Sequence, residues 1–535
     1  MVDMDVLVLG RGARAKGPKD LVNYHQRQLD RLGTPDYSDL AMCLQCGACY
    51  TELHCSVLRE HEPSGQAHCQ FLSIPGAKHP QRCNHPLESS LVRRPHGRDE
   101  IVFRPLSTVK LLDLGLWLYR FCSFHKSDSP LFQHITGRPA REPMEDIFDG
   151  QRFAPFQHQW CTDPDAVYMF FELAFDFASP FGKAARSSQK TKEKKVGLMH
   201  FILLNLPPDQ RTQTQNVCTA VVMDKEPSRT INGVLAFVVA TLHRLFVDGI
   251  TVRTADSQSK FLRVVLYVCT GDAPARAKCY GVPHHSGEWP CTCQASGSLI
   301  PIPPGARARP PRWSFTSMET FPTRTQQQIL GSLATVAAAT SKTARNTATS
   351  KEARGFRWTP LLSLPYYDAV ESVAWDFMHT WGERVVKTIV ARFVDLFGEQ
   401  FVARCNDLSN AARVESGLPA DVRNNIPLNI MSYFSTIKAH EVLVFTNTIG
   451  EHVFCLSGLL TAELNTVWRM LCDVSRFFSA YRVRSAELQQ YNALLRTALY
   501  RMHVADPGFD YPPSIHYATH IVENIRLYGP SYTTW

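Results

Sequence analysis

The chain has 535 residues, of which 44% are hydrophobic and 20% are charged, and its formal net charge is +8. This composition is that of an ordinary globular protein, and it excludes a disordered or coiled-coil chain. The length allows about two to four domains of ordinary size, and the modest positive charge permits an acidic partner without requiring one.

The sequence leads us to expect neither an export signal nor a membrane span. The opening residues, MVDMDVLVLGRG, lack the basic start and the apolar run of a secretory signal. The apolar run Gly233–Val247 is interrupted by His243 and Arg244 before it reaches the length of a bilayer span, so we predict a buried helix or strand there. We therefore expect an intracellular protein with no membrane partner, in which clustered cysteines bind metal more often than they pair.

The stretch CLQCGACYTELHC, Cys43–Cys55, is the strongest chemical signal in the chain. Cys43 and Cys46 form a C-x-x-C pair, and Cys46 and Cys49 form a second one. Such a pair places two thiolates on one tight turn, which suits two vertices of a zinc tetrahedron better than the single dithiol of a redox protein. The ligands that complete the site stay open among three candidates: His68 with Cys69, His79 with Cys83, and His158 with Cys161. The alternative for the second pair is a plain loop, because prolines and a glycine surround it in PGAKHPQRCNHP.

Other cysteines and histidines form looser groups further along the chain. With sixteen cysteines and twenty histidines, some close pairs arise by chance, and a lone cysteine in an apolar run is more often a packing residue than a ligand. The remaining candidate ligands are Cys279, Cys291 and Cys293 near His284 and His285, His452 with Cys455, and Cys472 with His516 or His520.

The apolar periodicity predicts a mainly α protein with minor β structure. Helices are predicted over 99–122 and 368–398, and a continuous helix without Pro or Gly over 461–503. Strands are predicted over 263–270 and 440–456, where β-branched and aromatic residues cluster.

Irregular or biased segments divide the chain into four predicted regions. Residues 1–98 form a Cys/His-rich zinc-binding region, and residues 99–293 a helical core with a basic loop at 183–195. Residues 294–357, rich in Pro and then in Ala, Thr and Ser, are predicted to be a flexible or weakly helical insertion. Residues 358–535 form a C-terminal helical region.

Arginines recur along the predicted C-terminal helix. After Arg469 and Arg476 the series continues with Arg482, Arg484, Arg496 and Arg501. Arginines on a rigid helix can hold the phosphates of duplex DNA without reading its sequence. A solvated helix face explains the same pattern, and the sequence leaves both interpretations open.

Taken together, CLQCGAC, the tail IHYATHIVENIRLYG, the scattered Cys/His pairs and the length resemble the herpesvirus DNA cleavage and packaging protein family. The resemblance implies a nuclear accessory factor, also present in the host cytoplasm, that helps to load replicated genomes into capsids. It implies a mostly helical chain with several structural Zn²⁺ ions, which assembles into a homopentameric ring with a basic channel for double-stranded DNA. A packaging motor or capsid proteins would be further partners.

The resemblance also implies particular site residues. The first zinc site would combine Cys43 and Cys46 with His158 and Cys161, and another would join Cys472 to His520, with His503 and His516 as competitors. The channel cations would be among Arg482, Arg484, Arg496 and Arg501. Two other classes stay open: a thiol-disulfide exchanger that uses the C-x-x-C pair, and a metal-dependent nuclease that uses the acids of DAVESVAWDF, Asp368, Glu371 and Asp376.

Overall fold

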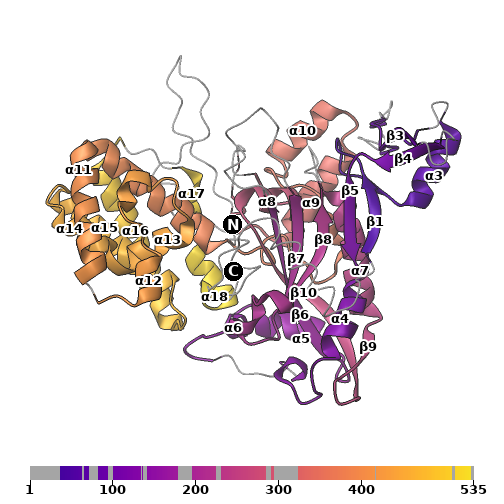
Figure 1. Cartoon of the computed structure of the whole chain (residues 1–535), viewed down its shortest axis with the longest axis horizontal. Coiled ribbons are helices and arrows are strands. Elements are labelled where there is room, and N and C mark those ends of the chain that lie inside the picture. The colour runs from indigo at the N-terminus through magenta and orange to yellow at the C-terminus, as the bar shows by residue number, and fades with distance from the viewer. Residues whose placement is uncertain are drawn as a thin grey trace. The chain divides into compact units, whose positions relative to one another are not determined.

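The computed structural model describes residues 37–62, 66–71, 82–93, 100–133, 135, 141–178, 196–224, 231–284, 289, 291–293, 323–415, 417–508 and 512–531. The chain divides into two compact units (Figure 1). Unit 1 comprises residues 1–138, 157–284 and 324–373, and unit 2 comprises residues 139–156, 285–323 and 374–535. Each unit therefore draws on segments from more than one of the four predicted regions. The predicted basic loop at 183–195 lies outside the described residues.

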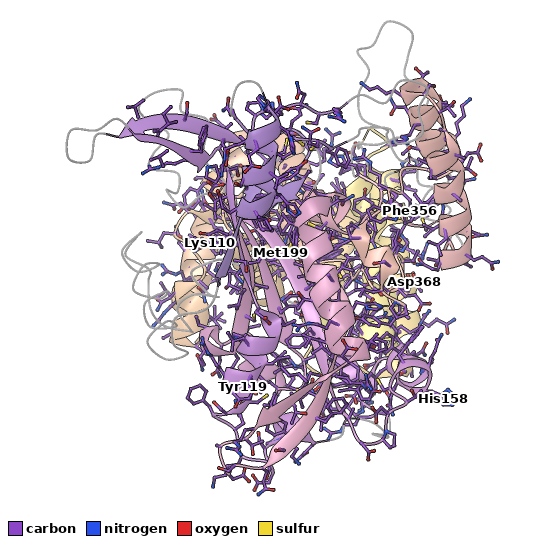
Figure 2. The ribbon with its side chains drawn as sticks, turned by 90° about the vertical axis from the view of Figure 1, so that its right-hand side faces the viewer. Lys110, Tyr119, His158, Met199, Phe356 and Asp368 are labelled. Carbon is purple, nitrogen blue, oxygen red and sulfur yellow. The ribbon has the colours of Figure 1, made fainter. Side chains whose placement is uncertain are left out.

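Unit 1 is built on an eight-stranded mixed sheet with the strand order β2-β1-β5-β8-β7-β6-β10-β9. Strands β6 and β10 are parallel, and all the other neighbours are antiparallel. Met199, on β7, is fully buried within this sheet (Figure 2). The strands are β1 (Tyr37–Met42), β2 (Cys49–Tyr50), β5 (Thr108–Leu112), β6 (Val167–Ala178), β7 (Val196–Leu203), β8 (Val217–Met223), β9 (Ile250–Arg253) and β10 (Ser259–Thr270).

Helices and a second, two-stranded sheet complete unit 1. Helix α7 (Asn232–Val247) packs against β10 through an apolar face that includes Leu235, Val239 and Leu242. This spacing of three and four residues is that of an amphipathic helix. The small sheet pairs β3 (Glu88–Arg93) with β4 (Glu100–Pro105). The other helices are α3 (Glu52–His61), α4 (Leu114–Cys122), α6 (Pro208–Arg211), α8 (Ala273–Cys279), α9 (Gln326–Ala338) and α10 (Lys342–Lys351), with short 3₁₀ turns at Pro130–Phe132, Thr214–Asn216 and Pro360–Ser363. The boundary between the units falls inside α5 (Phe153–Trp160).

The described part of unit 2 is helical and holds an aromatic core. Trp468 lies 4.5 Å from Phe454 between ring centroids, and Trp381 meets Phe478 edge to face at 5.2 Å. Its helices are α11 (Lys387–Glu415, kinked at Gly398), α12 (Ala420–Asn424), α13 (Ala439–Phe445), α14 (Glu451–Leu456), α15 (Ala462–Phe478), α16 (Ser485–Ala505), α17 (Pro513–Ala518) and α18 (Ile521–Tyr528). Unit 2 also contains two π-helices, η8 (Met378–Val386) and η10 (Thr446–Gly450), and two 3₁₀ turns, at Ile147–Asp149 and Ile430–Tyr433.

The structure agrees with a mainly α class, although the sheet of unit 1 is larger than the predicted minor β component. The predicted strand over 263–270 is confirmed as part of β10. The predicted strand over 440–456 is wrong, because this segment forms α13, η10 and α14. Its β-branched and aromatic residues Val442, Ile449 and Val453 are buried at helical spacing, so tertiary packing overrides their β preference. The predicted helix over 99–122 is helical only in α4, since β4 and β5 precede it.

The long C-terminal helix is two helices rather than one. Helix α15 ends at Phe478 and α16 begins at Ser485, although neither Pro nor Gly lies between them. The break is fixed by backbone pairing, since Met144 and Val483 exchange hydrogen bonds of 2.8 and 3.1 Å. In the predicted insertion, α9 and α10 are formed helices, and Ile329 and Leu333 on α9 are buried. Residues 326–338 and 342–351 are therefore helical, as the weakly helical alternative allowed, while 294–322 lie outside the described residues.

We predict that Gly233→Ala destabilises unit 1. A Cβ atom on Gly233, in the first turn of α7, would lie 2.3 Å from the Gly47 oxygen and 2.8 Å from the Cys49 nitrogen. Because both are backbone atoms, relief requires a shift of the chain, and we expect a loss of about 1 to 3 kcal/mol in the free energy of unfolding, measured by denaturant titration.

The matched control is Gly331→Ala in α9, where an added Cβ meets nothing within 4 Å. This substitution should be neutral or stabilising by up to ~1 kcal/mol, because alanine is the better helix former. Equal stability of the two variants would contradict the close packing of α7 on residues 47–49.

Candidate metal centres

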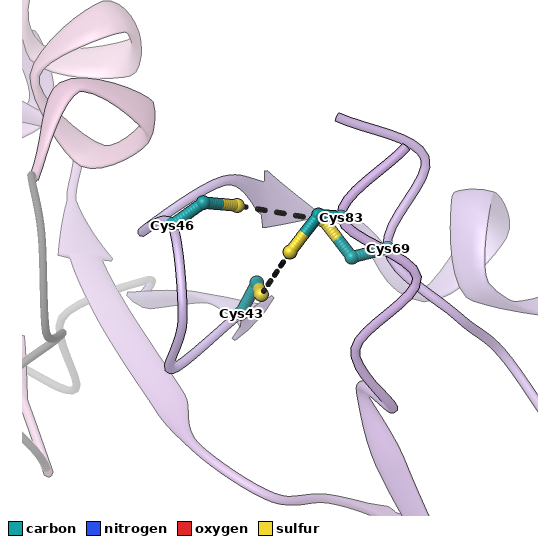
Figure 3. Close-up of side chains that lie close together, drawn as sticks. All are labelled: Cys43, Cys46, Cys69 and Cys83. Carbon is teal, nitrogen blue, oxygen red and sulfur yellow. Dashed lines mark hydrogen bonds between the residues drawn. The ribbon is translucent and has the colours of Figure 1, made fainter. Parts of the chain in front are cut away.

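Four cysteines of unit 1, Cys43, Cys46, Cys69 and Cys83, turn their sulfur atoms toward one another (Figure 3). The sulfurs all lie within 4.8 Å of each other, with 3.5 Å between Cys46 and Cys69 and 3.7 Å between Cys43 and Cys83. These separations are too long for disulfides. A tetrahedron of sulfurs around a metal at ~2.3 Å has edges of about 3.8 Å, so the four thiols are placed as ligands of one metal ion.

The first pair of cysteines sits on a tight turn that follows β1. The Gly47 nitrogen donates a hydrogen bond to the Cys43 oxygen at 2.8 Å, and the Cys43 nitrogen donates to the Ala48 oxygen at 2.9 Å. Gly47 has a φ of 73°, a left-handed conformation that glycine adopts without strain. The turn therefore points the Cys43 and Cys46 thiols to the same side.

The second pair lies on two antiparallel segments. The Cys69 nitrogen donates to the His85 oxygen at 2.9 Å, and the Asn84 nitrogen donates to the Cys69 oxygen at 3.0 Å. The Cys83 nitrogen donates to the Phe71 oxygen at 2.8 Å. Backbone pairing thus brings together two cysteines that are fourteen positions apart in the sequence.

Tyr50 supports this group from outside the ligand set. Its hydroxyl oxygen accepts a hydrogen bond from the Gln70 nitrogen at 3.0 Å and lies 3.2 Å from the Cys69 sulfur. With one lone pair engaged, the hydroxyl can donate its proton to that sulfur, as expected of a group that orients a metal ligand. Hydrogen bonds from the Cys43 and Cys46 thiols lower the pKa of Cys69 to about 4, so the group favours a thiolate.

Two cysteines of the opening stretch take no part in the group. Cys49, the third member of the repeated C-x-x-C, donates to the Gly47 oxygen at 3.6 Å, and burial raises its pKa to about 12. Cys55 is buried on α3, and its pKa is raised to about 11, chiefly by burial. Both are neutral packing thiols.

A second group in unit 2 combines Cys291 and Cys293 with His516 and His520. The Cys291 sulfur lies 3.0 Å from Nε2 of His520, and the Cys293 sulfur lies 3.3 Å from Nε2 of His516. The two Nε2 atoms are 3.3 Å apart, close to the edge expected for two imidazoles on one tetrahedral metal ion with bonds of ~2.0 to 2.1 Å. The group is a second set of four converging donors.

The two short helices α17 and α18, near the C-terminus, position the two histidines. His516 lies in α17 and His520 directly before α18, so they follow each other at the i, i+4 spacing that places side chains on one face. Nδ1 of His520 lies 3.5 Å from the Glu523 carboxylate, and the Trp375 ring stacks on the imidazole at 5.5 Å. A carboxylate behind a ligating histidine fixes its tautomer and orientation.

Hydrogen bonding sets the charge state of this second group. Contacts with Cys291 and His516 lower the pKa of the Cys293 thiol to about 2. Burial lowers the pKa of His520, but hydrogen bonds to Cys293 and Glu523 outweigh it and raise the value to about 9. The thiolate is therefore the favoured form at neutral pH.

Some of the cysteines and histidines predicted to bind metal lie outside the two groups. His158 is exposed on α5 (Figure 2), and Cys161 is a half-buried thiol whose pKa burial raises to about 12. The first group is completed by Cys69 and Cys83, which the sequence offered only as alternatives. Cys279 is buried at the end of α8, and burial raises its pKa. His79 and His285 lie outside the described residues.

The metal ligands predicted near the C-terminus also have partners other than those expected from the sequence. His520 does belong to a group, but with Cys291 and Cys293 rather than with Cys472. Cys472 is buried on the apolar face of α15, and Cys455 accepts a hydrogen bond from Nε of Arg469 at 3.3 Å. His452 joins neither group among the described residues. The signal for His516 is its i, i+4 spacing from His520.

The predicted DNA-binding arginines lie in different settings. Arg482 and Arg484 are exposed in the turn before α16, where Arg482 pairs with Glu145 at 2.9 Å. Arg496 is half-buried, and burial lowers its pKa. Arg501 lies 3.7 Å from Glu463. Only Arg496 and Arg501 lie within α16, so the four arginines do not form one continuous helix face.

Comparisons with protein-family models and with curated proteins found no match to this chain. Within the described ranges, none of the helices combines the length and the apolar character needed to cross a membrane.

We predict that Cys69→Ser lowers the bound metal from about two ions per chain to about one and destabilises unit 1, because three ligands leave the tetrahedron incomplete. Elemental analysis of the purified protein measures the loss. Cys49→Ser is the matched control, since this neighbouring thiol lies outside the group, and it should keep the full metal content. A loss that was equal in both variants would show that the first group is not a metal site.

For the second group, His516→Ala should remove one metal ion per chain, whereas Cys472→Ala should keep both. Because the groups lie in different units, the two losses should add. The double variant Cys69→Ser/His516→Ala is then expected to bind no metal. Retention of metal by His516→Ala together with loss in Cys472→Ala would return the site to the arrangement expected from the sequence.

Proposed function

We propose that this chain is a zinc-containing accessory protein for the packaging of replicated viral genomes, of the kind that the resemblance to herpesvirus DNA cleavage and packaging proteins implies. It binds duplex DNA without reading base sequence, and it acts in the host nucleus with a further population in the host cytoplasm. The observation that carries the proposal is the pair of metal-ligand groups, each complete with four protein side chains.

The chemistry of the donors supports zinc as the metal. Four thiols, or two thiols with two imidazoles, in a tetrahedral arrangement are typical of zinc, whereas Mg²⁺ and Ca²⁺ take oxygen ligands. Four protein ligands leave no vertex for a water molecule or a substrate. Each ion would therefore stabilise the fold rather than catalyse a reaction, and its binding would contribute directly to folding.

The same geometry bears on the two alternative functions. A thiol-disulfide exchanger needs a free thiolate, but Cys43 and Cys46 would be occupied by metal. A nuclease needs clustered carboxylates for Mg²⁺, and within the described part of the chain the two donor groups contain none. Asp368 accepts hydrogen bonds from the Val370 and Glu371 nitrogens, and Asp376 accepts one from the His379 nitrogen. Local capping thus explains these acids.

Arg482 and Arg484 are the arginines best suited to contact DNA. The side chain of Arg482 is 73% exposed, so its ion pair with Glu145 is a surface pair of small energy that a phosphate can replace. Arg484 is exposed, and its backbone nitrogen, rather than its guanidinium, donates to Glu487 at 3.1 Å. In a homopentameric ring these contacts would be repeated around one channel. A packaging motor or capsid proteins would be further partners of such a ring.

The test is the affinity of the full chain, with its metal bound, for unrelated DNA duplexes as a function of salt. Each phosphate contact adds about 0.9 to the slope of log affinity against log salt. Arg482→Ala/Arg484→Ala should therefore lower that slope by about 1.8 per bound chain and weaken binding to every duplex alike. Fluorescence anisotropy of labelled duplexes measures both quantities.

Arg404→Ala, at an exposed position of α11, is the control, and it should leave the salt slope unchanged. Light scattering of the same sample tests the ring, for which a mass several times the 60.3 kDa of one chain is expected. A monomer whose affinity for duplex DNA is unaffected by the double substitution would refute the proposal.

A further inference from the structure

A tryptophan with an exposed side chain follows the C-terminal end of α10 in unit 1. Trp358 is 58% exposed, although tryptophan side chains are mostly buried in folded proteins. The stretch from Ser341 to Trp358 carries five cations and a single acid, Glu352. An exposed aromatic ring therefore lies at the end of a positively charged stretch. This stretch contains none of the arginines proposed to bind duplex DNA.

The exposed face of α10 carries polar and basic side chains and no acid. Thr343, Asn346 and Thr347 are exposed along the helix, and Lys342 and Lys351 are exposed at its two ends, about 14 Å apart along the axis. Arg357 is exposed beyond the helix. Within the part of the chain that the structure describes, Lys342, Lys351 and Arg357 form no ion pair. Their charges are available to an anionic partner.

The turn that carries Arg357 and Trp358 is held by several hydrogen bonds. After α10, the Ala353 nitrogen donates to the Ala348 oxygen at 3.0 Å and the Gly355 nitrogen donates to the Thr349 oxygen at 2.8 Å. Arg324, which is buried, donates to the Ala353 oxygen at 3.1 Å and lies over the Phe356 ring.

The next residues are anchored in the same way. The Arg357 nitrogen donates to the Gly281 oxygen at 2.8 Å, and the Trp358 oxygen accepts from the Asn232 side chain at 3.2 Å. Because the backbone is already ordered, a ligand that binds there pays little entropy for ordering it.

We propose that Lys342, Lys351, Arg357 and Trp358 form a binding surface for single-stranded nucleic acid. The cations contact phosphates, and the indole ring of Trp358 stacks on an unpaired base. An exposed aromatic ring beside a positively charged track is the arrangement by which proteins hold single strands. In a duplex the base faces are covered by neighbouring bases, so the ring would have no partner there. This surface is independent of the proposed binding of duplex DNA.

The test is binding of fluorescently labelled single strands, oligo(dT) in one arm and oligo(U) in the other, to the metal-loaded full chain. Trp358→Ala should weaken binding by roughly 5- to 150-fold, the loss that corresponds to one stacked base. Lys351→Ala/Arg357→Ala should lower the salt slope by about 1.4, because each single-strand phosphate contact adds about 0.7. The arm that binds more tightly identifies DNA or RNA as the ligand.

Matched controls are Phe124→Ala, which removes an exposed aromatic ring elsewhere in unit 1, and Lys126→Ala, which removes an exposed cation. Neither should change the affinity. Trp358→Phe keeps a ring that can stack, so it should retain most of the binding, and the quenching of tryptophan emission by oligo(dT) should be smaller than in the unmodified chain. This second readout remains informative if Trp358→Ala does not fold.

Three results would overturn the proposal. The first is unchanged affinity of Trp358→Phe and Trp358→Ala together with unchanged quenching. The second is tighter binding of a duplex than of either single strand through Lys351 and Arg357. The third is equal binding of polyglutamate, which carries charge but no bases, since it would show a surface that attracts any polyanion.

Discussion

The placement of four thiols within 4.8 Å of one another is the constraint on which the Cys-rich part of unit 1 depends. Ionised sulfurs at that distance repel each other, and neutral thiols bond only weakly, so a cation among them would stabilise the arrangement. The surrounding hydrophobic core adds little stability of its own, because Leu87 is the one large aliphatic side chain among its described buried members; the others are Ala41, Cys43, Cys46, Cys55, Ala67 and Cys69. With so few aliphatic side chains, this part of the chain resembles small domains in which metal binding supplies the folding energy.

Unit 2 places its metal ligands in a different setting. Cys291 and Cys293 border a large core whose buried aromatic residues include Trp381, Phe393 and Trp468. Burial of that apolar surface is itself stabilising, so a bound metal ion would act mainly by positioning its ligands. The ion would tie the segment around Cys291 to α17 and α18, while Trp375 and Glu523 hold the imidazole of His520 in place. One bound ion would thus build the fold in unit 1, and a second would join segments in unit 2.

The sequence identifies local features better than distant ones. Cys43 and Cys46 are recognisable because their spacing suits a tight turn, and β10 because its apolar pattern is strong, whereas the apolar run of α7 leaves helix and strand both open. The partners of Cys46 depend on the backbone pairing of residues near Cys69 and Cys83, which no local pattern encodes. Likewise His520 is identified but its partner is not, because Cys472 is equally plausible until the fold brings Cys291 and Cys293 to the imidazole instead. The prediction of a strand over segment 440–456, made from its β-branched residues, is wrong. The segment is helical because helical spacing buries those residues in the core.

The separation between the ligands of the second group bears on the order of events during protein synthesis. Cys291 and His520 are 229 positions apart, whereas Cys43 and Cys83 are separated by only 40. A ribosome making this chain releases the complete first ligand set early and supplies His520 hundreds of residues later. Until then Cys291 and Cys293 are reduced thiols without their imidazole partners, exposed to oxidants and to competing soft metals. If the second group binds metal, the interval before its ligand set is complete would be the period in which the nascent chain is most open to binding the wrong metal or partner.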